Sequence, residues 1–177
     1  MVFIATLISV VIGLPIGMLL VVSDPKGVKP NKTLHKILDM VLINITRSIP
    51  FVILMVLVIP LSRLLIKRSY GSTAFIIPLA LGAAPFVARI IEGALKEVNE
   101  GLTEASKSMG ASNYEIIFKV MIPEALPSLI HGMTLTLISL IGYSAMAGAI
   151  GGGGLGNSAV VDGYQRSNPE IMWQATV

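Results

Sequence analysis

The feature that most constrains the fold of this chain is the length of its uncharged, apolar segments. Residues 1–22 contain no charged side chain, and no Asp, Glu, Lys or Arg occurs from Ala125 to Val161. A helix needs roughly 20 predominantly apolar residues to cross about 30 Å of hydrocarbon. Only 13% of the residues are charged and 54% are hydrophobic, whereas about a quarter are charged in soluble domains. The sequence therefore predicts an all-α membrane protein.

The apolar segments predict four membrane spans and the beginning of a fifth, within one transmembrane domain over 1–177. Glycines at 151–154 are expected to end the fourth span. A fifth apolar segment starts near Ile171, and because the sequence stops at Val177 we expect this span to be truncated. The four complete spans are expected at about 1–22, 37–61, 72–91 and 125–150.

Lysine and arginine are distributed unevenly between the connecting segments. Segment 23–36 carries four of these residues, and segment 92–124, with Arg89 at its edge, carries another four. The loops on the opposite side of a four-span arrangement carry four in total, at Arg63, Lys67, Arg68 and Arg166. Loops rich in Lys and Arg lie on the cytoplasmic side. We therefore expect 23–36 and 92–124 in the cytoplasm and the N-terminus outside.

Segment 92–124 is polar and charged, although it lies between two apolar spans. From Glu92 its apolar residues recur at intervals of three and four, which is the pattern of one face of an amphipathic helix. Gly110 is suited to end this helix, because glycine tolerates a left-handed backbone. Ser112 and Glu115 fit a capping box that begins a second helix, which we expect to stop at Pro123. The apolar face of the first helix comprises Leu95, Val98, Leu102, Ala105 and Met109.

The residues of this helix pair allow three interpretations. The simplest is an amphipathic connector that lies flat among the lipid headgroups. A DNA-binding helix-turn-helix is excluded, because six Glu against three Lys in 92–124 offer no positive surface to phosphates; no nucleic-acid partner is expected. The third is a docking element for a soluble partner. Rigid helices would transmit the movement of that partner to the membrane spans.

A sequence signature favours the third interpretation. The stretch "EASKSMG" at 104–110, followed by "VMIP" at 120–123, resembles the EAA signature (E-A-A-x3-G-x9-I-x-L-P) of permease subunits in bacterial ABC importers. Ser106, Val120 and Ile122 depart from it conservatively. The resemblance implies a cytoplasmic coupling helix pair that sits in a cleft of an ATP-hydrolysing subunit. The residues it implies in coupling to that ATPase are Glu104, Ala105, Ser106, Gly110, Ala111 and Pro123.

Other stretches resemble the permease of bacterial methionine importers from the first span to the start of the fifth. They are "RSIPFVILMVLVIP" (47–60), "GAAPFVARIIEGAL" (82–95), "IPEALPSLI" (122–130) and "GYSAMAGAIGGGGLG" (142–156). The resemblance implies a five-span ABC importer permease fold, a permease homodimer, two ATP-binding subunits and an extracytoplasmic methionine-binding lipoprotein at the bacterial plasma (inner) membrane. It further implies alternating-access import of D- and L-methionine. ATP and Mg would be bound by the partner ATPase, so no cofactor and no enzymatic activity are expected in this chain.

Candidate residues for a translocation pathway lie in two places. Small residues in "GYSAMAG" (142–148) leave room for a substrate, and Tyr143, Ser144 and Met146 offer mixed polarity. Arg47 lies inside the expected second span, where a charged side chain is a functional candidate. An alternative for Arg47 is that it reaches the cytoplasmic surface or pairs with Asp39.

Several patterns that resemble other chemistry are better explained by structure. "GGGGLGNS" (151–158) fits G-x-G-x-x-G, but it follows an apolar helix rather than a strand, and Asn157 stands where a phosphate-binding loop needs lysine. We expect these glycines to end the span and allow close backbone packing. The chain has no cysteine, and His35 and His131 lack a metal-ligand spacing, so no metal site is expected.

The residues are also compatible with three functions other than that of a methionine permease. A permease of the same class for another amino acid or a small solute would look similar, because substrate choice also resides in the binding protein. An ion-coupled transporter or channel is less favoured, because such proteins carry buried carboxylates and only Asp39 is a candidate. A membrane scaffold without transport activity is the third alternative.

Overall fold

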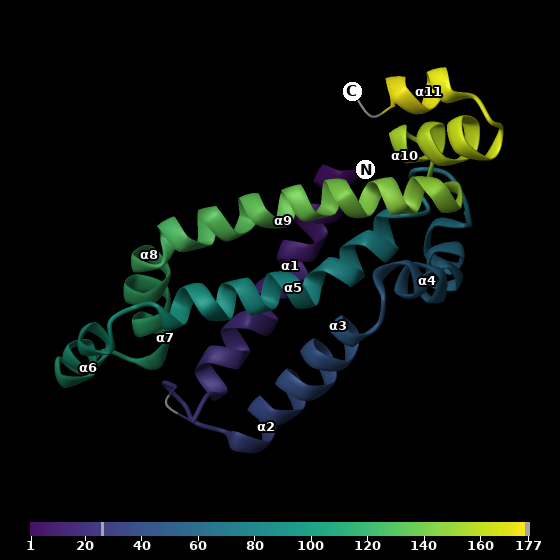
Figure 1. Ribbon diagram of the computed structural model, residues 1–177. Helices are drawn as coiled ribbons and strands as arrows, with labels where there is room; N and C mark the ends of the chain where they lie inside the picture. Colours follow the sequence, from purple (N-terminus) through teal and green to yellow (C-terminus); the bar gives the residue numbers. More distant parts are fainter. Residues whose placement is uncertain (26, 176–177) are drawn as a thin grey trace. The chain divides into compact units, whose positions relative to one another are not determined.

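The computed structural model describes residues 1–25 and 27–175, including all their side chains except those of Leu42 and Arg47. These residues form helices and contain no strand (Figure 1). Several α-helices continue into π-helical turns, which are labelled η. The elements are α1 (Val2–Ser23), α2 (Lys32–Ile37), η1 (Leu38–Ile45), α3 (Thr46–Ser48), α4 (Phe51–Ile66), α5 (Ile76–Lys96), α6 (Glu100–Ser108), α7 (Asn113–Glu115), η2 (Ile116–Met121), α8 (Ile122–Glu124), α9 (Leu126–Ala147), η3 (Gly148–Gly152), α10 (Leu155–Asn157), η4 (Ser158–Gln165) and α11 (Pro169–Gln174).

Within the described residues, three helical segments are long and apolar enough to cross a membrane. They are Val2–Ser23, Ile76–Lys96 and Leu126–Gly152, and the apolar helix Phe51–Ile66 is shorter. The first of them agrees with the expected span at 1–22, whereas the second begins later and ends later than the expected 72–91. The total of five spans stays a prediction from the family resemblance.

The expected second span at 37–61 is wrong as a single continuous helix. Helical structure runs from Lys32 to Ser48, breaks at Ile49 and Pro50, and resumes in α4 at Phe51. Pro50 has an extended backbone, with φ −53° and ψ 133°. Proline has no backbone N–H and disfavours helical geometry in the preceding residue, so the helix ends before it.

The described residues pack as two units, and α1, α5 and α9 each contribute residues to both. The first unit comprises Met1–Ser9, Arg47–Ala83 and Leu137–Val177, and the second comprises Val10–Thr46 and Ala84–Thr136. The first unit has its own apolar core, whose fully buried side chains include Met55, Phe75, Leu79 and Leu140.

In the second unit, two glycines allow α1 and α5 to pack closely. A Cβ atom added to Gly13 would lie 2.8 Å from the Cβ of Val87, and one added to Gly17 would lie 2.7 Å from the carbonyl oxygen of Ala88. Small residues one helical turn apart allow membrane helices to approach in this way. The contact belongs to a core that continues into segment 92–124 through buried Ile91, Leu95, Val98, Ile116 and Met121.

Candidate functional site

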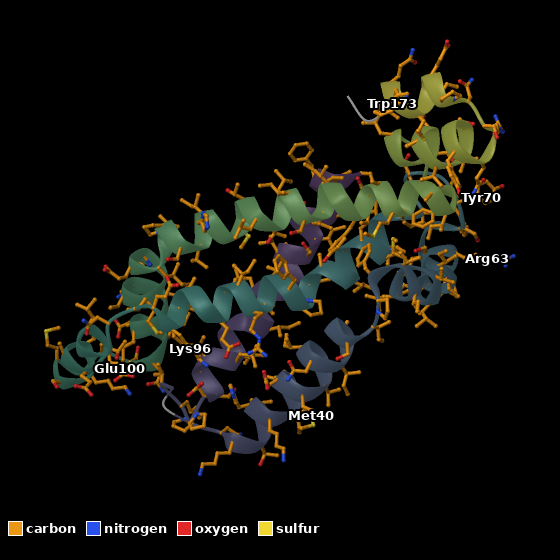
Figure 2. The ribbon with its side chains drawn as sticks, viewed as in Figure 1. Met40, Arg63, Tyr70, Lys96, Glu100 and Trp173 are labelled. Atoms are coloured by element: carbon orange, nitrogen blue, oxygen red, sulfur yellow. The ribbon has the colours of Figure 1, made fainter. Side chains whose placement is uncertain are left out.

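The segment 92–124 folds as a set of short helices within the second unit. The single helix expected from Glu92 to Met109 is wrong, because α5 ends at Lys96 and α6 begins at Glu100 (Figure 2). Asn99 separates them: its side-chain oxygen accepts a hydrogen bond from the backbone N–H of Gly101 at 2.8 Å. Asparagine is among the best residues for this position, because it satisfies a backbone donor that the helix leaves unpaired.

The break divides the expected apolar face into two parts with different environments. Leu95 and Val98 are buried in the core of the second unit. By contrast, Leu102 and Ala105 of α6 are exposed, Leu102 by 42%, and Met109, which directly follows α6, is 80% exposed. The side chain of α6 that is buried belongs to Ser106, whose hydroxyl donates to the carbonyl of Leu102 at 2.7 Å. The outer half of the predicted apolar face is therefore free for another surface.

The turn between the helices has the geometry predicted from Gly110. Its φ is +84°, in the left-handed region that favours glycine. The N–H of Gly110 donates to the carbonyl of Lys107 at 2.9 Å, and the N–H of Ala111 donates to the carbonyl of Ser106 at 3.0 Å. These bonds satisfy carbonyls at the end of α6 and fix the direction in which the chain leaves it.

The capping box predicted after the turn is present. The Ser112 hydroxyl accepts from the Glu115 N–H at 3.4 Å, and the Glu115 carboxylate accepts from the Ser112 N–H at 3.1 Å. Lys119 lies 2.9 Å from the same carboxylate. The hydrogen bond from Lys119, followed by those from Ser112, lowers the pKa of Glu115 to about 2, because each favours the charged carboxylate.

The expected end of the second helix at Pro123 is wrong. Helical structure continues from α7 through η2 into α8, and ends at Glu124. Pro123 is the second residue of α8, which directly follows the π-helical η2. The helical segment therefore leads directly to α9, with Ala125 as the one residue between them.

Exposed apolar side chains gather on the helices around the turn. Tyr114 is 66% exposed and Phe118 is 43% exposed, and their ring centroids lie 4.4 Å apart. Residues spaced by four lie on the same face of a helix, which brings these two rings together. We define the exposed coupling face as Leu102, Glu104, Ala105, Met109, Tyr114 and Phe118, all of which are exposed.

A second polar feature of the same unit is a series of ion pairs. Lys96 Nζ lies 2.7 Å from Asp24 Oδ2 and 2.8 Å from Glu92 Oε1. Glu92, 3% exposed, also accepts from Arg89 at 2.6 Å, and Arg89 pairs with Asp39. We define the charge series as Asp24, Lys96, Glu92, Arg89 and Asp39. Sequence reasoning missed it because it joins three distant segments. A signal for part of it was available: Arg89, Glu92 and Lys96 recur on one face of α5.

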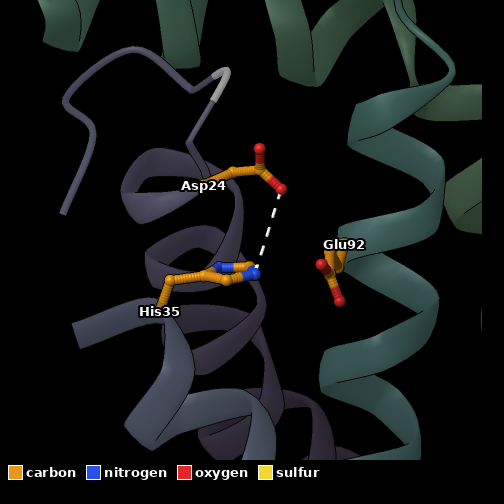
Figure 3. A group of neighbouring side chains, drawn as sticks. All are labelled: Asp24, His35 and Glu92. Atoms are coloured by element: carbon orange, nitrogen blue, oxygen red, sulfur yellow. Dashed lines mark ion pairs between the residues drawn. The ribbon is translucent and has the colours of Figure 1, made fainter. Parts of the chain in front are cut away.

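His35 approaches the same series. Asp24, His35 and Glu92 each place one possible ligand atom within 4.8 Å of the others (Figure 3). His35 Nε2 lies 4.0 Å from Asp24 Oδ2, and Nδ1 lies 3.1 Å from the carbonyl oxygen of Leu20. The Lys96 ammonium already bridges both carboxylates, so a metal ion would have to displace it. This cluster is therefore an ion-paired junction.

The candidate pathway residues belong to the first unit. The Tyr143 ring stacks on that of Phe51, with centroids 3.9 Å apart, and the Ser144 hydroxyl donates to the carbonyl of Ile141 at 2.7 Å. Met146 is 45% exposed. The side chain of Arg47 lies outside the described residues, whereas Asp39, its suggested partner, pairs with Arg89. A pathway role for these residues stays a prediction.

The glycine-rich stretch packs backbone against backbone, as its structural explanation predicts. A Cβ atom at Gly156 would lie 2.0 Å from the carbonyl oxygen of Ala145, and one at Gly148 would lie 2.7 Å from the carbonyl oxygen of Gly153. Asn157 donates to the carboxylate of Asp162 at 3.2 Å. A carboxylate beside the position where a phosphate loop needs lysine is unfavourable for an anionic ligand.

Comparison with known proteins identifies the class to which this architecture belongs. Residues 10–177 match the family of binding-protein-dependent transport system inner membrane components. The chain belongs to this family, and is thus the multi-pass inner-membrane component of a transport system.

Individual relatives cover almost all of the chain. A probable D-methionine transport system permease protein of Pasteurella multocida is 50% identical over 175 residues, which are 99% of this chain and 80% of the relative. A methionine import system permease protein of Bacillus subtilis is 48% identical over 90% of this chain and 71% of its own length. A chain from the inward-facing MetNI methionine ABC transporter is 46% identical, with a TM-score of 0.95 over 99% of this chain and 81% of that one.

Proposed function

We propose that this chain is the permease subunit of an ATP-driven importer that moves methionine, in its D- and L-forms, across the bacterial inner membrane. The observation that carries the proposal is the likeness, at 46% identity and a TM-score of 0.95, to a chain of a methionine ABC transporter. The names of the relatives from Pasteurella multocida and Bacillus subtilis support the same substrate.

In this proposal, two permeases form a homodimer and two ATP-binding subunits dock on its cytoplasmic side. The partner subunits bind ATP and Mg, and the chain itself needs no cofactor. Closure of the two ATP-binding subunits moves segment 92–124 of each permease, which we call the coupling segment, and alternately opens the membrane domain to each side. Glu104, Ala105 and Met109 supply exposed contacts, whereas Ser106, Gly110 and Ala111 fix the turn that presents them. Pro123 lies where the segment joins α9.

The outer side of the assembly is proposed to receive methionine from an extracytoplasmic binding lipoprotein. This requires the N-terminus to lie outside, with 23–36 and 92–124 in the cytoplasm. Methionine would then pass along residues that include Tyr143, Ser144, Met146 and Arg47. Tyr143 and Met146 are one helical turn apart on α9, which allows both to face one path.

Docking is tested by co-purifying the full chain with the ATP-binding subunit expressed beside it. Met109→Glu places a charge where an apolar side chain would be buried against the partner, and Glu104→Lys reverses a charge on the exposed coupling face. Each should reduce recovery of the ATPase by about tenfold, equivalent to about 1.4 kcal/mol. The matched control is Tyr70→Glu, whose side chain is 79% exposed, similar to Met109, but lies outside the coupling segment. Equal recovery of the ATPase by all three variants would contradict the docking role.

A further inference from the structure

We propose that Lys96 is a positioning residue through which movement of the coupling segment reaches α1 and η1. The inference rests on the proposed function, since it concerns how the same coupling segment acts on the membrane helices. The charge series would then transmit movement between helices during transport, in addition to stabilising the fold.

Lys96 is placed where the coupling segment meets the membrane helices. It is the last residue of α5, shortly before Asn99 caps α6 (Figure 2). Its ammonium contacts Asp24, which directly follows α1, and Glu92, one turn earlier on α5. A displacement of the start of α6 therefore acts directly on the residue that joins the ends of α5 and α1.

The link continues beyond Lys96 through charges of alternating sign. Buried Glu92 joins Lys96 to Arg89, and Arg89 joins α5 to Asp39 of η1. Glu92 is the buried member of this series, and separating it from Lys96 and Arg89 would leave its carboxylate buried without compensation. The charge series thus couples α5 to two other segments.

Packing alone does not fill the space beside this link. A cavity of about 290 Å³ lies next to Lys96. Its walls include Val21 near the end of α1, Val98 between α5 and α6, and Thr103 of α6. Where side chains leave such a gap, van der Waals contact between the facing segments is lost. The Asp24–Lys96 ion pair lies beside this cavity and adds a polar link to the apolar cluster in which Val21, Leu95 and Val98 pack.

The decisive measurement is methionine uptake per ATP hydrolysed, in liposomes containing the full chain with its ATP-binding subunits and the methionine-binding protein. Lys96→Met should lower this ratio by about fivefold or more, within the usual range of coupling between sites, while the ATPase still co-purifies. Lys96→Arg should restore coupling, because it keeps the positive charge. Lys96→Met is expected to fold, because buried Glu92 keeps its ion pair with Arg89.

A double-mutant cycle separates this role from a general structural one. Asp24→Asn removes the ion pair that joins Asp24 to Lys96 but leaves Lys96 paired with Glu92. By itself it should lower the ratio of uptake to hydrolysis, and adding Lys96→Met should lower that ratio little further. The control, Arg166→Met, removes an ion pair to Asp162 of 2.9 Å in the other unit and should leave the ratio unchanged.

An unchanged ratio in Lys96→Met, or effects of the two substitutions that multiply in the double variant, would overturn the inference. If Lys96→Met fails to assemble, the ratio measured for Asp24→Asn decides the question. A wild-type chain that neither binds the ATPase nor takes up methionine would instead refute the proposed function on which this inference depends.

Discussion

Glu115 shows how a single side chain can fix the start of a helix in the coupling segment. Its carboxylate accepts from the backbone of Ser112 and from Lys119, and its own N–H donates to the Ser112 hydroxyl. The start of α7 is thereby fixed directly after the Gly110 turn. The orientation of Tyr114 and Phe118 follows from this start, because both lie within the next turns of the same helical segment.

The lowered pKa of Glu115 predicts a local dependence on pH. Since the folded pKa, about 2, lies below the ordinary value of 4.5, the stabilisation is complete above about pH 4.5 and is lost as the pH falls toward 2. Hydrogen exchange in 112–121, corrected for the intrinsic exchange rate, should accelerate across that range. Glu115→Gln should remove this dependence, whereas an unaltered pH profile in that variant would contradict the assignment.

At the residue scale, local patterns were predictable and distant pairings were not. Gly110 and the Ser112–Glu115 box depend on neighbours a few residues away, so their spacing was sufficient to predict both. The Arg89–Asp39 pair joins residues far apart in the chain, and no local pattern specifies which partner Arg89 selects.

At the scale of the elements, the positions of helix ends determine which segments can move separately and which apolar side chains stay exposed. Pro50 divides what hydropathy suggests is one span, and Asn99 separates α6 from α5. The sequence did not predict these two breaks, because the spacing of apolar residues continues across each of them. A residue that caps a helix does not interrupt that spacing. The second break leaves Leu102 and Met109 exposed while Leu95 stays in the core.

The close contact between α1 and α5 predicts a position-specific effect on stability. Gly13→Ala places a Cβ 2.8 Å from Val87, and such overpacking should cost about 1–3 kcal/mol. The matched control is Gly93→Ala on α5, where no atom lies within 4 Å of an added Cβ. The thermal midpoint of the detergent-solubilised chain should fall for Gly13→Ala and not for Gly93→Ala. Equal midpoints for the two variants would contradict close packing at Gly13.

At the scale of the whole molecule, the membrane class followed from long uncharged segments, and the family from the EAA-like signature and other matching stretches. The family match over residues 10–177 confirms both. Composition could not supply the arrangement of the coupling segment, because burial of Ser106 and exposure of Met109 depend on how α6 packs in the folded unit. The substrate is likewise proposed from relatives, since the described side chains of the first unit specify no methionine contact.

The methionine-permease function is tested by uptake of labelled methionine into liposomes that contain the full chain, its ATP-binding subunit and the methionine-binding protein. Methionine should accumulate only when ATP and all three proteins are present, and an imposed proton or sodium gradient should not replace ATP. Accumulation driven by an ion gradient without the ATPase would rule out an ATP-driven methionine permease, as would ATP-dependent accumulation of another solute with no methionine uptake.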